Sequence, residues 1–191
     1  MMARDREDHA QDAASQVLAR VWQAIVASRA VPAARDSRWY LDKAVEAAHD
    51  FASIVSAGQE APGVEGEFYR GAAESLLAAV ALGVATVAPM GQATPAAVLS
   101  TLRALTDGQH RSGYLLDGWF ATFEDGGARQ VVADAYAAAR SAAGPSRDIR
   151  ASVCTTAKIY LRRYNPDAGT AWKPNVAIIE PAQGAVEEIV W

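Results

Sequence analysis

The sequence predicts an all-α fold, a compact bundle of six to seven helices with a short extended C-terminal segment. Alanine supplies 43 of the 191 residues, a composition that favours thin, closely packed helices. The larger apolar residues recur at steps of three and four through most of the chain, which is the period of one helix face. Glycine and proline interrupt this pattern at intervals that match the lengths of helices.

The first two expected helices are amphipathic. The first covers residues 4–29 and ends before Pro32, while Asp36 and Ser37 offer N-cap oxygens for a second helix that Gly58 closes. The apolar positions of the first helix are Val17, Leu18, Val21, Trp22, Ile25 and Val26. Those of the second helix are Leu41, Ala44, Val45, Ala48, Phe51, Ala52 and Val55.

A third helix, expected from near Glu67, becomes apolar on all sides toward its end, and this pattern predicts a central helix. We expect the core to centre on its four large side chains Leu76, Leu77, Val80 and Val84. Its unbroken apolar part, residues 76–87, is too short to span a bilayer. We therefore interpret it as a buried core helix and expect no direct membrane contact.

Caps mark two of the remaining helices. Thr94 followed by Pro95 combines a capping hydroxyl with proline at the first helical position, and Ser146 offers a second N-cap. The bounds that we expect for the remaining elements are 95–107, 114–123, 128–143 and 147–164, with β character only at residues 176–179.

The chain carries no motif of a known catalytic or metal site. It contains no Gly-Lys pair, hence no phosphate-binding loop, and neither HExxH nor GxSxG. The lone Cys154 cannot form an internal disulfide, and no Cys/His cluster has the spacing of metal ligands. The N-terminus lacks the apolar core of a signal peptide. We expect a non-enzymatic cytoplasmic protein without cofactor or metal.

Charge is distributed unevenly along the chain. Residues 126–173 contain eight basic and three acidic side chains, a net charge of +5 against −9 for the rest of a chain whose net charge is −4. On the last helix, Arg147, Arg150, Lys158 and Arg162 follow one stripe through Cys154 at steps of three and four. The neighbouring stripe, which should face the core, is Ile149, Val153, Thr156, Tyr160 and Tyr164.

Two interpretations of this basic stripe remain open. It is either an ordinary solvated face, favoured near a helix C-terminus by the helix dipole, or a surface that binds DNA phosphates or an acidic protein. Cys154 is interpreted as a small, half-buried side chain, because a reactive thiol needs a stabilised thiolate.

Three ordered segments carry a family resemblance. The first is an aromatic-led helix with a Leu-Leu pair, Phe68-Tyr69-x-x-Ala72-Ala73-x-x-Leu76-Leu77-Ala78-Ala79. The second is Thr94-Pro95-Ala96-Ala97-Val98-Leu99-x-x-Leu102, and the third is Ser152-Val153-Cys154-Thr155-Thr156-Ala157 with Leu161, which runs towards Pro174-x-Val176. Their order and spacing, from about Ser37 to Val176, resemble the helical domain of TraG-like coupling proteins in type IV secretion and conjugation systems.

This resemblance implies the all-α domain of such a coupling protein, excised from its ATPase. In the family, the domain interrupts the nucleotide-binding domain of a hexameric ATPase at the cytoplasmic face of the inner membrane. There it helps to receive relaxase–DNA complexes or secreted proteins. The nucleotide-binding motifs and membrane helices of the family are absent from this sequence, so ATP hydrolysis is not carried over. An inserted domain leaves and re-enters one scaffold, so we expect its two ends to lie close together.

The implied organisation has three parts. Residues 1–36 form an N-terminal helix that the family does not match, residues 37–173 form the substrate-recognition domain, and residues 174–191 form an extended tail where re-entry to a missing ATPase domain is possible. The leading hypothesis is a domain that docks a relaxase or a secretion substrate protein. Two alternatives stay open: a helical module that binds DNA directly through the basic stripe, and an unrelated small helical enzyme or regulator.

Overall fold

The computed structural model describes residues 2–32, 34–59, 63–107, 112–123, 127–164, 171–172 and 174. All secondary structure within these residues is helical, which confirms the all-α prediction and its six to seven helices. The elements are α1 (Met2–Ala30), α2 (Ala34–Ser56), α3 (Gly63–Val87), α4 (Pro95–Thr106), α5 (Ser112–Ala121), α6 (Gly127–Ala143), α7 (Arg147–Leu161) and a 3-10 turn, η1 (Arg162–Tyr164). The β character expected at residues 176–179, and nearly all of the expected tail, lie outside the described residues.

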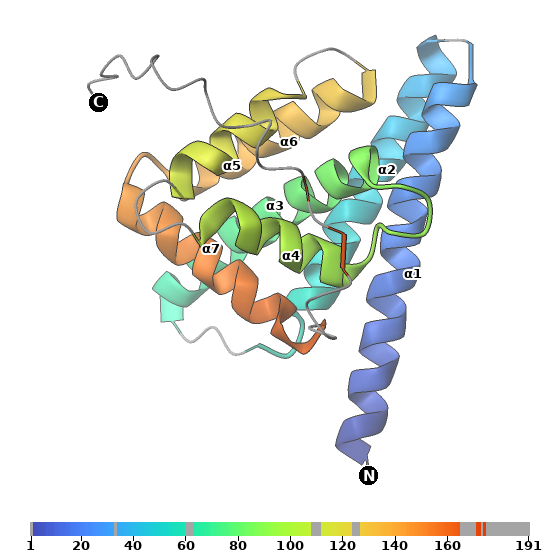
Figure 1. Ribbon diagram of the computed structural model, residues 1–191. Coiled ribbons are helices and arrows are strands. Elements are labelled where there is room, and N and C mark those ends of the chain that lie inside the picture. Colours follow the sequence, from blue (N-terminus) through green and yellow to red (C-terminus); the bar gives the residue numbers. More distant parts are fainter. Residues whose placement is uncertain are drawn as a thin grey trace.

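Helix α3 is the centre of the bundle. It contacts α1, α2, α4, α6 and α7, and Figure 1 shows it enclosed by these helices. Leu76, Leu77, Val80 and Val84 are all buried, as predicted. The stretch Glu65–Val87 is long and apolar enough to cross a membrane by composition, yet 72% of its most apolar window is buried inside the protein. A helix in the core of the bundle explains both its apolar composition and its burial.

Helices α1 and α2 form a pair along one side of the bundle (Figure 1). From Ala14 onward, α1 buries one face in the same hydrophobic core as the rest of the chain, while its N-terminal turns extend past the other helices in Figure 1. Val26 lies at the edge of that face and is 39% exposed. The described part of residues 1–36 therefore shares its core with the described part of residues 37–173. The C-terminal end of the chain lies outside the described residues, so the expected proximity of the two ends stays a prediction.

The starts of two helices differ from the sequence prediction. Helix α2 begins at Ala34, so Asp36 lies in its first turn, where the helix dipole favours a carboxylate, and does not act as the N-cap. Helix α3 begins at Gly63, earlier than the expected start near Glu67. Both errors have the same physical cause: Asp and Glu are favourable at several positions of a first turn, so they mark a helix start only to within a few residues.

Local capping signals, by contrast, are confirmed. The Thr94 hydroxyl accepts a hydrogen bond from the Ala97 N–H at 3.1 Å, with Pro95 at the first helical position. The Ser146 hydroxyl accepts from the Ile149 N–H at 3.5 Å and begins α7. Gly144, at φ 74°, makes the reversal between α6 and α7, a conformation that side chains with a Cβ disfavour. The turn brings the end of α6 beside the start of α7.

The core face of α7 is wider than predicted. Val153, Tyr160 and Tyr164 are buried, but Ile149 and Thr156 are only half-buried. Ala157 and Leu161, which the predicted stripe omits, are fully buried. Because α7 packs against both α3 and α4, it buries a broad face and not a single line of residues.

Helix α5 contributes a cluster of aromatic residues that supports α6. The Phe120 and Tyr136 rings are stacked, with centroids 3.8 Å apart and an interplanar angle of 7°. Trp119 packs edge to face against Phe120 and Phe123. This packing fixes the position of Asp117, which lies on the same helix and faces α6 and α7.

Candidate partner-binding site

The structure separates the four basic residues predicted on α7 into two pairs. Arg147 and Arg162 are exposed, while the side chains of Arg150 and Lys158 are each only 25% exposed. Both half-buried cations form ion pairs with carboxylates on other helices. The stripe is therefore a surface with two exposed ends and a middle that holds helices together.

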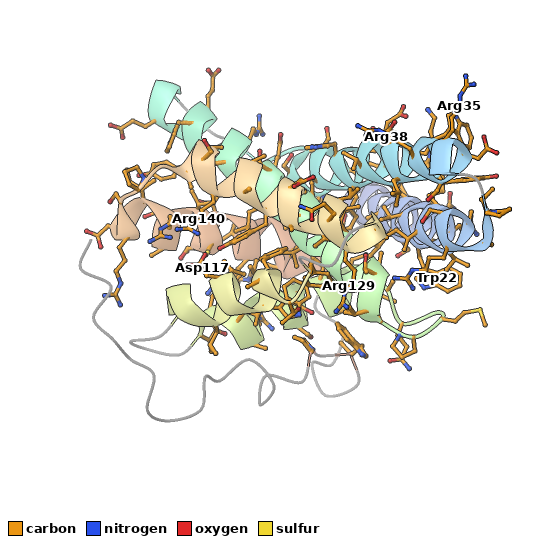
Figure 2. All side chains as sticks on the ribbon, turned by 90° about the horizontal axis from the view of Figure 1, so that it is seen from above. Trp22, Arg35, Arg38, Asp117, Arg129 and Arg140 are labelled. Atoms are coloured by element: carbon orange, nitrogen blue, oxygen red, sulfur yellow. The ribbon has the colours of Figure 1, made fainter. Side chains whose placement is uncertain are left out.

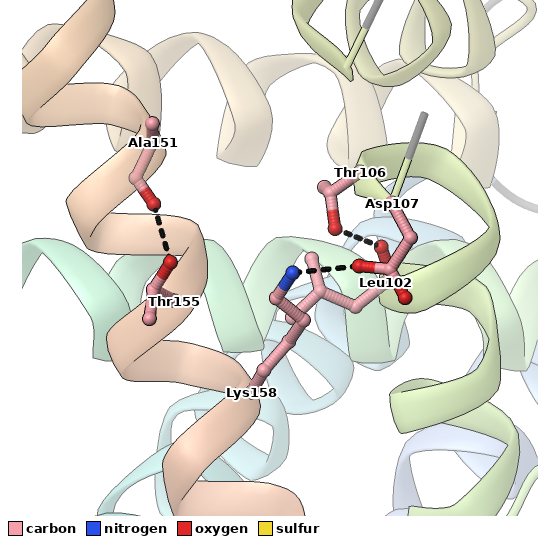
Figure 3. A network of polar contacts seen from close by, with 6 residues as sticks. All are labelled: Leu102, Thr106, Asp107, Ala151, Thr155 and Lys158. Atoms are coloured by element: carbon pink, nitrogen blue, oxygen red, sulfur yellow. Dashed lines mark hydrogen bonds and ion pairs between the residues drawn. The ribbon is translucent and has the colours of Figure 1, made fainter. Parts of the chain in front are cut away.

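Lys158 connects α7 to the end of α4. Its Nζ donates a hydrogen bond to Asp107 Oδ1 at 2.8 Å, as Figure 3 shows. Asp107 is the C-cap of α4, and its own backbone N–H donates to the Arg103 carbonyl oxygen at 2.9 Å. Lys158 thus places a positive charge at the negative end of the α4 dipole, a favourable arrangement that explains this cation without a partner molecule.

Arg150 belongs to a different cluster, centred on Asp117. The Asp117 Oδ1 accepts a hydrogen bond from the Tyr136 hydroxyl at 2.6 Å. Arg140 Nη1 lies 3.7 Å from the same oxygen, and Arg150 Nη1 lies 3.8 Å from Oδ2. Figure 2 shows Arg140 and Asp117 facing each other at one end of the molecule. Three helices, α5, α6 and α7, therefore meet at one carboxylate.

The thiol of Cys154 lies in this electrostatic environment. Its pKa is raised to about 11, chiefly by burial and to a smaller extent by the charge of Asp117, whereas the charges of Lys158 and Arg150 act in the opposite direction. Burial and the hydrogen bond to Asp117 also raise the pKa of Tyr136. Both groups are therefore protonated at neutral pH. Cys154 is half-buried, as the sequence predicts.

The sequence prediction missed the structural role of Arg163. Arg163 Nη2 donates to the carbonyl oxygens of Ile54 and Val55, at 2.8 and 3.1 Å, and so satisfies the C-terminal end of α2. Arg29 makes the same kind of contact with Thr86 near the end of α3, at 3.0 Å. The partners of Arg163 lie up to 109 residues away in sequence, so no local pattern could have identified its role.

The described part of the chain has no residue group of the kind that binds metal ions. Among those residues, no group of three His, Cys, Asp or Glu side chains is arranged so that it could hold a metal ion. His49 is exposed on α2.

The fold and the site together define a small all-α protein with a cationic surface at the junction of α6 and α7. Comparison with protein-family models, with curated proteins and with solved structures finds no match to this chain. The resemblance to TraG-like coupling proteins therefore rests on the residues quoted above.

Proposed function

We propose that this chain is a substrate-recognition domain of the TraG-like coupling-protein type, which docks a relaxase–DNA complex or a secreted protein for transfer. The observation that carries the proposal is where the three resembling segments lie. They fall on α3, α4 and α7, and each of these helices contacts the other two. Segments that are far apart in sequence thus form one structural unit, as expected if they derive from one family domain.

The exposure of the basic residues, and the carboxylates beside them, favour a protein partner over DNA. Tight DNA binding requires several cations that are free to neutralise phosphates. Lys158 is already hydrogen-bonded to Asp107, the Asp117 carboxylate lies beside Arg150, and the chain has a net charge of −4. Arg147 and Arg162 are exposed and contribute positive charge to the surface that would receive an acidic protein segment. The proposed domain has no catalytic step of its own, and we expect the purified chain not to hydrolyse ATP.

Binding of purified partners tests this proposal. The probes are the relaxase of the same cell bound to its DNA, and the same DNA alone, each measured at roughly 50 and 200 mM salt. We expect the purified chain to bind the relaxase complex and to ignore the free DNA. The variant that combines Arg147→Glu, Arg150→Glu and Arg162→Glu should lose this binding while it keeps its helical circular dichroism. Failure to bind relaxase complexes and secreted proteins alike would refute the proposed function.

A further inference from the structure

The cluster around Asp117 has hydrogen-bonding capacity that the fold does not use. The distances of 3.7 and 3.8 Å from Asp117 to Arg140 and Arg150 are those of ion pairs and are too long for N–H···O hydrogen bonds. The short hydrogen bond that Asp117 accepts comes instead from the Tyr136 hydroxyl, at 2.6 Å. Two guanidinium groups are therefore held beside one carboxylate without hydrogen-bonding to it, and their N–H donors stay available for another acceptor.

Both guanidinium groups are within reach of an external molecule. The side chains of Arg140 and Arg150 are 42% and 25% exposed, and that of Asp117 is 30% exposed. Arg147 is exposed one turn before Arg150 and adds positive charge to the same junction. Asp148 is also exposed, but residues two apart on a helix do not share a face, so it points away from Arg150.

We propose that Arg140 and Arg150, held by Asp117 where α6 meets α7, form a docking site for an acidic segment of a partner protein, with which Asp117 competes. This inference rests on the proposed function and assigns that function a place and a partner chemistry. An arginine fork recognises a carboxylate through two parallel N–H···O bonds. Asp117 attracts both cations from a position fixed by Tyr136, and a carboxylate of the partner would replace it beside them.

The test uses a fluorescein-labelled peptide of alternating Glu and Ser residues, with the Gln counterpart of that peptide as the uncharged probe. We expect the whole chain to bind the Glu peptide and not the Gln peptide. The double variant Arg140→Gln/Arg150→Gln should bind the Glu peptide at least about tenfold more weakly, because it loses two charge-assisted recognition groups. The matched control is Arg35→Gln/Arg38→Gln, which removes the same charge from exposed positions at the opposite end of the molecule (Figure 2) and should bind normally.

The variant Asp117→Asn separates recognition from a purely structural role. The Asn oxygen still accepts from Tyr136, but the internal competitor is neutralised, so the Glu peptide should bind about two- to fivefold more tightly. Unchanged or weaker binding of the Glu peptide by Asp117→Asn would refute the proposal that Asp117 competes with the partner. If both arginine double variants lost the same affinity for the Glu peptide, the loss would reflect net charge alone and would refute the docking site. An oligonucleotide that binds through Arg140 and Arg150 more tightly than the peptide does would also overturn it.

The same measurements keep the two proposals apart. A chain that binds the Glu peptide through Arg140 and Arg150 but no relaxase complex or secreted protein refutes only the transfer role. A chain that binds the relaxase complex equally well with and without these two arginines refutes only the docking site.

Discussion

Replacing Gly83 and Gly71 by alanine should have opposite effects on stability, although both glycines lie inside α3. Alanine in a helix interior is favoured over glycine by about 0.5–1 kcal/mol, because it restricts the unfolded chain. At Gly71 an added Cβ meets nothing within 4 Å, so this gain should appear in full. At Gly83 the Cβ would lie 2.9 Å from Trp119 Cζ3 and 3.3 Å from Cζ2, with Cη2 closer still.

Trp119 has little freedom to move away. It is 4% exposed, and its ring packs against Phe120 and Phe123 with centroids 4.8 and 5.1 Å away. Overpacking of such a site costs about 1–3 kcal/mol. After subtraction of the helix-propensity gain, Gly83→Ala should lower the free energy of unfolding by about 1 kcal/mol. Gly71→Ala should raise it by nearly that amount.

Urea denaturation followed by circular dichroism measures both changes as shifts of the midpoint at constant m-value. In thermal unfolding, 1 kcal/mol corresponds to roughly 2–4 °C for a chain of this size. The double variant Gly83→Ala/Trp119→Phe adds a control, since the smaller Phe ring should remove most of the clash and give a coupling of about 1 kcal/mol. A Gly83→Ala protein that is stabilised as much as Gly71→Ala would refute the close approach of α3 and α5.

Three further predictions concern single side chains. Arg163→Met should destabilise the fold by about 1–3 kcal/mol in urea denaturation, because the carbonyl oxygens at the end of α2 lose their charged donor. Thr94→Ala should cost about 1 kcal/mol by the same assay, and Thr94→Ser almost nothing, because serine still caps α4. Cys154 should react slowly with iodoacetamide at pH 7 in the folded protein and rapidly after unfolding. Because its folded pKa of about 11 exceeds the usual thiol value of 9.0, the thiol contributes stability below pH 9 that should be lost as the pH rises from 9 through 11.

The sequence by itself determined the fold class, the central helix and the N-caps of α4 and α7. Thr94 and Ser146 could be recognised because a cap acts on an N–H only three residues away. The all-round apolar character of residues 76–87 predicted the core of α3 for a similar reason, since burial on every side leaves no polar face in the sequence. Only Val87, at the end of that stretch, is exposed, at 40%. The starts of α2 and α3 were less accurate, because acidic residues favour several positions of a first turn.

Only the tertiary structure decided which carboxylate lies beside each cation. Arg147, Arg150, Lys158 and Arg162 are equivalent as a helical stripe, yet Lys158 pairs with Asp107, 51 residues away in sequence, and Arg150 with Asp117. Arg140, outside the predicted stripe, proved to share that second carboxylate. The physical reason is that helical periodicity fixes the direction of a side chain on its own helix, whereas an ion pair depends on how two helices pack.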